Sequence, residues 1–213
     1  RFLERNRKVL LATALAATLA SLGTAASLGW KALPVVAGAS FIGATYRRGF
    51  FSRGRRLSLS AIPGSKDILV AAALGVVAVA MPVWQVGHPW TPQAWAALIF
   101  VTGLGFARTV IYDIRDMQND QVLGRETLPI VIGKRRAKVV MVTLMALLGI
   151  TAVGATLLGT RVHAGLIALI FGLCLFYPLF YLWYYYERFT TGRPRFEVKP
   201  EVSFYVLGLL ALV

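Results

Sequence analysis

Long apolar stretches recur along the whole of this sequence and constrain its fold more than any other feature. A helix needs about 20 mainly apolar residues to cross the hydrocarbon core of a bilayer. Stretches of this kind occupy Val9–Leu28, Ala32–Tyr46, Ile68–Val86, Pro92–Tyr112, Val139–Leu158 and Ala164–Tyr186, and another begins at Val202. Only 15% of the residues are charged, against about 25% in soluble domains. The pattern predicts an all-α fold, a polytopic bundle of transmembrane helices.

The basic residues predict how this bundle lies in the membrane. If the helices alternate in direction, the segments that share one side are 1–8, 47–66, 113–138 and 187–201, and they contain 20 of the 23 Lys and Arg residues. Cytoplasmic loops carry an excess of such residues. We therefore predict a multi-pass protein of the cell (inner) membrane with these segments in the cytoplasm. Because the charges lie at helix ends, next to anionic lipid headgroups, we expect membrane lipids and not nucleic acid as partners.

Acidic residues are scarce, yet three of the nine lie close together, in the stretch YDIRDMQND. On a helix, the spacing of Asp113, Asp116 and Asp120 places their side chains within about 60° of one another. Like charges on one face repel unless a cation lies between them, and Mg²⁺ prefers carboxylate oxygen. The alternative is a solvated helix end whose acids only balance the nearby arginines, Arg108, Arg115 and Arg125.

The segment DIRDMQNDQVLGRETLPIVIG, residues 113–133, resembles the second aspartate-rich signature of UbiA-type intramembrane prenyltransferases, D-x-x-D-x-x-x-D. The order of the other elements is also similar: a helix ending at Tyr46, a basic inner loop, then Ile62–Lys66 before the next helix. On this resemblance the chain contains about seven spans of the family's nine-helix fold. It would form a single transmembrane prenyltransferase-like domain, residues 1–213, that is incomplete at both ends.

The resemblance implies a reaction. Family members transfer a polyprenyl group from a polyprenyl diphosphate to a lipophilic, often aromatic, acceptor in the membrane, with Mg²⁺ as cofactor, as in quinone or related isoprenoid biosynthesis. By this resemblance Asp113, Asp116 and Asp120 would be the catalytic metal ligands. The residues that would bind the diphosphate are Arg115, Lys66, Arg47, Arg48 and Tyr46.

Two features of the family pattern are missing. The first signature, N-D-x-x-D-x-x-x-D, does not occur, and position 50 is Phe where many members carry Lys four residues after the Tyr. The other acids lie singly or too far apart to form a facing motif: Glu4, Asp67, Glu126, Glu187, Glu197 and Glu201. We therefore expect a fragment that lacks the family's first two helices and is inactive, or nearly so, on its own.

Three other functions remain open. The chain could be a non-catalytic remnant that binds lipid or diphosphate. It could be a cation-coupled transporter, although transport sites usually lie near mid-membrane on broken helices, whereas this triad lies at a helix end. CDP-alcohol phosphatidyltransferases also use clustered aspartates, but their motif begins D-G-x-x-A-R, which Asp113 and Ile114 do not match.

Overall fold

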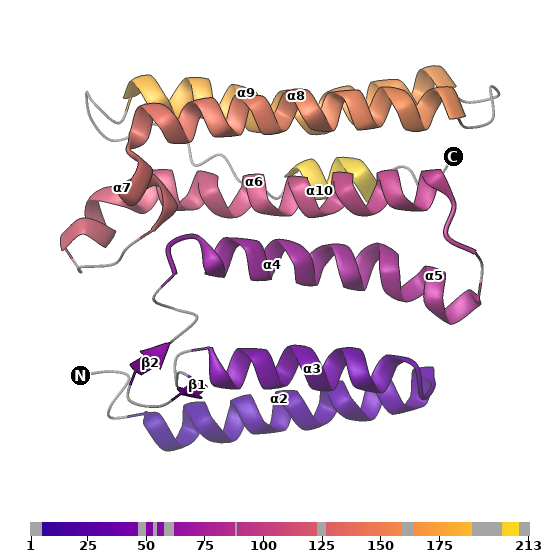
Figure 1. The fold of residues 1–213 in the computed structure, drawn as a ribbon, viewed down its shortest axis with the longest axis vertical. Coiled ribbons are helices and arrows are strands. Elements are labelled where there is room, and N and C mark those ends of the chain that lie inside the picture. The colour runs from indigo at the N-terminus through magenta and orange to yellow at the C-terminus, as the bar shows by residue number, and fades with distance from the viewer. Residues whose placement is uncertain are drawn as a thin grey trace. The chain divides into compact units, whose positions relative to one another are not determined.

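The computed structural model describes residues 6–46, 50–52, 55–57, 62–87, 89–122, 127–158, 164–188 and 202–208, and these are mostly helical (Figure 1). The chain divides into two compact units. The first contains Arg1–Ser60 with Trp84–Gly87, and the second contains Ala61–Val83 with His88–Val213. The predicted site residues are divided between them, so each unit is described by itself.

In the first unit, helices α2 (Arg7–Leu28) and α3 (Ala32–Thr45) pack together as a hairpin. The turn depends on Gly29, whose φ of 117° strains any other residue type, and whose N–H donates to the carbonyl of Ala26. Strands β1 (Phe50–Ser52) and β2 (Arg55–Leu57) follow and pair antiparallel. The sequence indicated only a basic loop there, so the short strands are an addition to the all-α prediction.

The second unit begins with a continuous helical path of three elements: α4 (Ser65–Gly75), the π-helix η2 (Val76–Ala80) and α5 (Met81–Val86), whose last turn clusters with the first unit. The remaining helices are α6 (Pro92–Val122), α7 (Leu128–Ile132), α8 (Lys134–Leu158), α9 (Ala164–Arg188) and α10 (Val202–Gly208). Helix α6 continues ten residues beyond the predicted end of its apolar span at Tyr112. All three aspartates of the triad therefore lie on one continuous helix.

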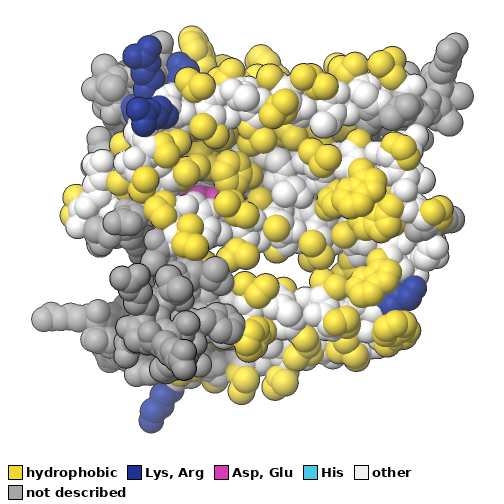
Figure 2. Space-filling view, viewed as in Figure 1, with side chains coloured by type: hydrophobic (Ala, Val, Ile, Leu, Met, Phe, Trp, Pro, Cys, Tyr) yellow, Lys and Arg dark blue, Asp and Glu magenta, His cyan; other side chains and the backbone are white. Residues whose placement is uncertain are grey.

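Four described helical segments are long and apolar enough to cross a membrane: Lys8–Ser27, Ser65–Val86, Pro92–Met117 and Lys134–Gly154. Two shorter apolar helices cover Ala32–Thr45 and Ile167–Phe180. Large apolar side chains such as Leu15, Ile150 and Phe176 are exposed, and most of the described side chains on the face drawn in Figure 2 are hydrophobic. A lipid environment removes the cost of such exposure. The predicted polytopic helical bundle is confirmed.

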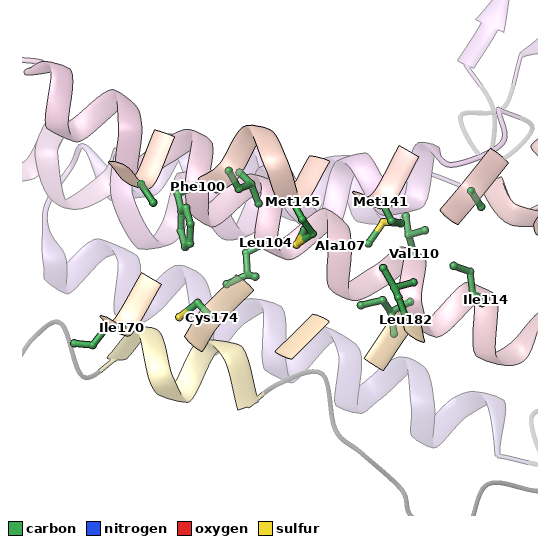
Figure 3. Close-up of a cluster of buried hydrophobic side chains, with 14 residues drawn as sticks. Phe100, Leu104, Ala107, Val110, Ile114, Met141, Met145, Ile170, Cys174 and Leu182 are labelled. Carbon is green, nitrogen blue, oxygen red and sulfur yellow. The ribbon is translucent and has the colours of Figure 1, made fainter. Parts of the chain in front are cut away.

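Helix α6 supplies the centre of the core (Figure 3). Its buried positions Phe100, Leu104, Ala107, Ile111 and Ile114 are spaced by alternate steps of four and three residues, which places them on one face. The buried partners come from α8 and α9: Met141, Met145, Leu148, Ile170, Cys174 and Leu182. The C-terminal end of α6, which contains the triad, therefore continues from a helix that is packed on both α8 and α9.

A different face of α6 packs against α4, and small residues bring the two backbones close. A Cβ atom added at Gly105 would lie 3.3 Å from the Cα of Ala71, and one added at Gly75 would clash with the hydroxyl of Thr102. Higher numbers on α4 meet lower numbers on α6, so the helices are antiparallel. This close contact fixes which residues face each other one turn further along, where both helices carry charge.

We expect Gly105→Leu to destabilise the protein, because the new side chain would have to push α4 away from α6. Overpacking of this kind costs about 1–3 kcal/mol. The measurement is the unfolding midpoint in detergent, followed by tryptophan fluorescence. Gly172→Leu on α9 is the matched control, because a Cβ atom there has nothing within 4 Å. Equal midpoints for the two variants would contradict the packing described above.

Candidate functional site

The structure brings two of the predicted residues, Lys66 and Asp113, into direct contact. Gly64, with φ of 75°, turns the chain into α4 so that Lys66 lies in its first turn. The Lys66 Nζ atom donates to Asp113 Oδ1 at 3.2 Å. The lysine side chain is 61% exposed, whereas that of Asp113 is 6% exposed. The carboxylate is thus held inside the unit, and its partner cation reaches it from the outside.

Next to this pair lies an acid that the sequence analysis did not select, Asp67. It is only 1% exposed, and its carboxyl group is within hydrogen-bonding reach of Asp113 and Thr109 on α6. Its Oδ1 atom has no hydrogen-bond partner among the described residues. Asp67 is isolated along the sequence, so no motif marks it. The available signal was its position in the first turn of an apolar membrane helix, because acids in such helices are usually functional.

The other two aspartates of the triad have different surroundings. Asp116 is paired with its neighbour Arg115, whose Nε lies 2.9 Å from Oδ1 and whose Nη2 lies 3.1 Å from Oδ2. The Arg115 guanidinium also lies over the ring of Tyr112, 4.7 Å from its centroid. Asp120, one turn further along α6, is buried. The predicted Arg115 is therefore next to the triad, but it is engaged with a carboxylate.

The described residues fit a cation that is only partly held by protein. No group of three or more His, Cys, Asp or Glu side chains among them is placed to hold a metal ion. Positions 113 and 120 are about 10 Å apart along a helix axis, so one ion cannot contact both aspartates. Mg²⁺, however, usually binds one or two carboxylates and completes its shell with water and substrate phosphates. The buried carboxyl group of Asp67 suits that role, because its Oδ1 atom has no hydrogen-bond partner among the described residues.

The described structure does not test the roles of three predicted residues. Tyr46 follows α3 in the first unit, and Arg47 and Arg48 lie outside the described residues. Their role stays a prediction. A second residue that the sequence analysis did not select is Thr127, whose buried Oγ1 has no hydrogen-bond partner in the described structure. It lies near the start of α4, because a Cβ atom added at Gly64 would lie 3.4 Å from the side chain of the next residue, Leu128.

The chain is similar to known proteins over most of its length. The model of the UbiA prenyltransferase family matches residues 4–199. The chain is 29% identical over 157 residues to digeranylgeranylglyceryl phosphate synthase of Thermococcus gammatolerans, which covers 71% of this chain and 54% of that protein. The enzyme of the same name from Thermococcus kodakarensis is 31% identical over 157 residues, with 71% and 53% covered.

A shorter match, 35% identical over 68 residues, is to somaliensene A/B synthase of Streptomyces somaliensis, and it covers 32% of this chain and 23% of that protein. The chain thus spans about half the length of the Thermococcus relatives, and less of the Streptomyces protein. No solved structure matches the chain significantly.

Proposed function

Because this chain belongs to the UbiA prenyltransferase family, we propose that it forms part of a membrane enzyme that transfers a polyprenyl group from a prenyl diphosphate to a lipophilic acceptor with Mg²⁺ as cofactor. The site would face the cytoplasm. The observation that carries the proposal is the pairing of Asp113, buried on α6, with the exposed Lys66 of α4. It joins a carboxylate suited to a metal ion with a cation suited to a phosphate.

In this proposal Asp113, Asp116 and Asp120 hold Mg²⁺ either directly or through metal-bound water, because Asp113 and Asp120 lie too far apart along α6 to contact one ion together. The bound ion would offset the negative charge of the departing diphosphate and so favour cleavage of the allylic carbon–oxygen bond. Lys66 and Arg115 each contact one of these carboxylates now. With a metal ion on these carboxylates, Lys66 and Arg115 would be available for phosphate oxygens, to which they would make strong charge-assisted hydrogen bonds. The apolar helices would keep water away from the reacting carbon.

The relatives suggest which substrates to test first. The two Thermococcus proteins are named for digeranylgeranylglyceryl phosphate, so geranylgeranyl diphosphate with a phosphorylated glycerol lipid is the first donor and acceptor pair. Aromatic acceptors of the kind used in quinone biosynthesis form the second set.

The test is transfer of a radiolabelled prenyl group by the intact protein in membranes. We expect Mg²⁺-dependent release of diphosphate and a labelled lipid product with at least one acceptor. Binding of prenyl diphosphate without release would instead favour a non-catalytic remnant. Ion flux in liposomes that contain no donor, lost when the triad is changed, would favour a transporter. Either of these results, with no labelled product, overturns the proposal.

We expect Lys66→Met to raise the KM for the prenyl diphosphate and to lower kcat/KM by about 10- to 100-fold. A hydrogen bond to a charged group is worth about 1.5–3 kcal/mol, and about 1.4 kcal/mol corresponds to a factor of ten. Lys66→Arg should recover part of the loss. The matched control is Lys31→Met, because Lys31 donates to the backbone carbonyl of Trp84 in the first unit. An unchanged KM in Lys66→Met would remove Lys66 from the diphosphate site.

A further inference from the structure

We propose that Asp67 is a further ligand of the divalent cation, so that the ion is held between α4 and α6 by Asp67 and Asp113. The inference rests on the proposed function, because it concerns the same cation. It differs in one respect: it places a ligand on a second helix, outside the aspartate-rich motif. Because Asp67 and Asp113 would both be protein ligands, we expect the ion to bind even when no prenyl diphosphate is present.

The first argument is the unpartnered oxygen. Asp67 is almost completely buried, and its Oδ1 atom accepts no hydrogen bond from the described residues. An unsatisfied buried polar atom costs about 1–3 kcal/mol, and a charged one costs more. Asp67 could avoid this cost if a cation bound to the open oxygen. Its other contacts are with Asp113 and Thr109, so the open oxygen belongs to a group that already adjoins the triad.

The second argument is the local charge. Asp67 and Asp113 are both buried and close enough for a hydrogen bond between their carboxyl groups, and Asp120 also acts on Asp113 electrostatically. Lys66 contacts Asp113 and also acts on Asp67 electrostatically, but its side chain is largely exposed, so this one cation only partly offsets the two buried carboxyl groups. Arg115 is engaged with Asp116. Two adjacent carboxylates repel when both are ionised, and a divalent cation between them turns this repulsion into attraction.

The third argument is the rigidity of the contact. The antiparallel packing of Ala71 against Gly105 places Asp67, one turn before Ala71, beside Thr109, one turn after Gly105. Asp113 follows one further turn along α6. Sites built on packed helices hold their ligands more exactly than sites on loops. Carboxylate oxygens at fixed positions suit a small, hard cation such as Mg²⁺ or Mn²⁺.

The test measures Mn²⁺ binding to the purified intact protein in detergent, without substrate, by the electron paramagnetic resonance signal of free Mn²⁺. We expect Asp67→Asn to weaken binding at least about tenfold, because loss even of a residue that only supports a ligand weakens metal affinity about 10- to 100-fold. Asp113→Asn should have an effect at least as large. Gln85→Ala, which removes an exposed polar side chain from α5, is the control and should bind like the wild type.

The outcomes separate this inference from the proposed function. If Asp113→Asn loses Mn²⁺ while Asp67→Asn binds it normally, Asp67 is not a ligand, and the role proposed for Asp113 stands. If the wild type binds no Mn²⁺ without substrate, or if neither variant weakens binding, the inference is overturned, whereas the proposed function is decided separately by Mg²⁺-dependent release of diphosphate in the presence of donor and acceptor.

A measurement on the wild type covers the case in which Asp67→Asn does not fold. Fe²⁺ with ascorbate and peroxide cleaves the backbone near a bound ion, and the cut sites are read by mass spectrometry. We expect cuts at the start of α4 as well as around Asp113, both suppressed by excess Mg²⁺. Suppressible cuts around Asp113 alone would contradict the inference.

Discussion

Asp120→Asn should reduce prenyl transfer by the intact protein by about 10³-fold or more. Asp120 is buried near the end of α6, on the same face as Asp113. Asparagine has nearly the same shape, so the helix is expected to keep its packing and to lose only the negative charge. Metal ions supply several kcal/mol of charge stabilisation in such reactions, and about 4 kcal/mol corresponds to a factor of 10³. The measurement is the rate of diphosphate release at saturating Mg²⁺.

The control for this experiment is again Gln85→Ala, which removes an exposed polar side chain from α5 and should leave the rate unchanged. A normal unfolding midpoint for Asp120→Asn would exclude global destabilisation as the cause of the loss. Activity near the wild-type level would remove Asp120 from the metal site, and the triad would then reduce to Asp113 and Asp116. The third acid of the D-x-x-D-x-x-x-D motif would be structural in that case.

The helices could be predicted well from the sequence because the membrane imposes a simple rule on composition and length. The described helices α2, α3, α6, α8 and α9 each overlap a predicted span. The rule did not predict where each helix ends. Helix α6 passes the end of its apolar run by ten residues, because hydrogen bonding along the backbone continues whether or not the side chains are apolar.

The site could be predicted only where it follows a local pattern. Asp113, Asp116 and Asp120 share one helical face, and that follows from spacing alone. Asp67 lies 46 positions before Asp113, and their contact depends on which helices pack together and in which register. Two small residues, Ala71 and Gly105, set that register. Their significance cannot be read from a chain that contains 20 glycines.

Spacing also did not predict the pairing between neighbours. Arg115 was predicted to bind diphosphate, and in the structure it donates two hydrogen bonds to Asp116. Together with the Lys66–Asp113 pair, this means that each predicted phosphate-binding cation near the triad is held by a predicted metal ligand. In the proposed function, metal and diphosphate would therefore depend on each other: the metal would free Lys66 and Arg115 for the phosphate, and the phosphate would free Asp113 and Asp116 for the metal.

This mutual dependence leads to the other large effect, which is expected on removal of the metal. Chelation by EDTA should abolish prenyl transfer, and added Mg²⁺ should restore it. Without a cation, Lys66 and Arg115 stay with their carboxylates, and the diphosphate meets unneutralised acids instead of free basic groups. We therefore expect chelation to weaken prenyl diphosphate binding as well as turnover, which a filter-binding assay with labelled donor would measure.

The identity of the restoring ion gives this prediction its control. Mn²⁺ should replace Mg²⁺, because both are hard cations that carboxylate and phosphate oxygens suit. Ca²⁺ should restore donor binding better than turnover, because it takes six to eight oxygen ligands at longer distances and so neutralises the leaving diphosphate less closely. Full transfer activity in EDTA, with the metal content of the protein verified as zero, would show that the aspartates do not act through a metal ion.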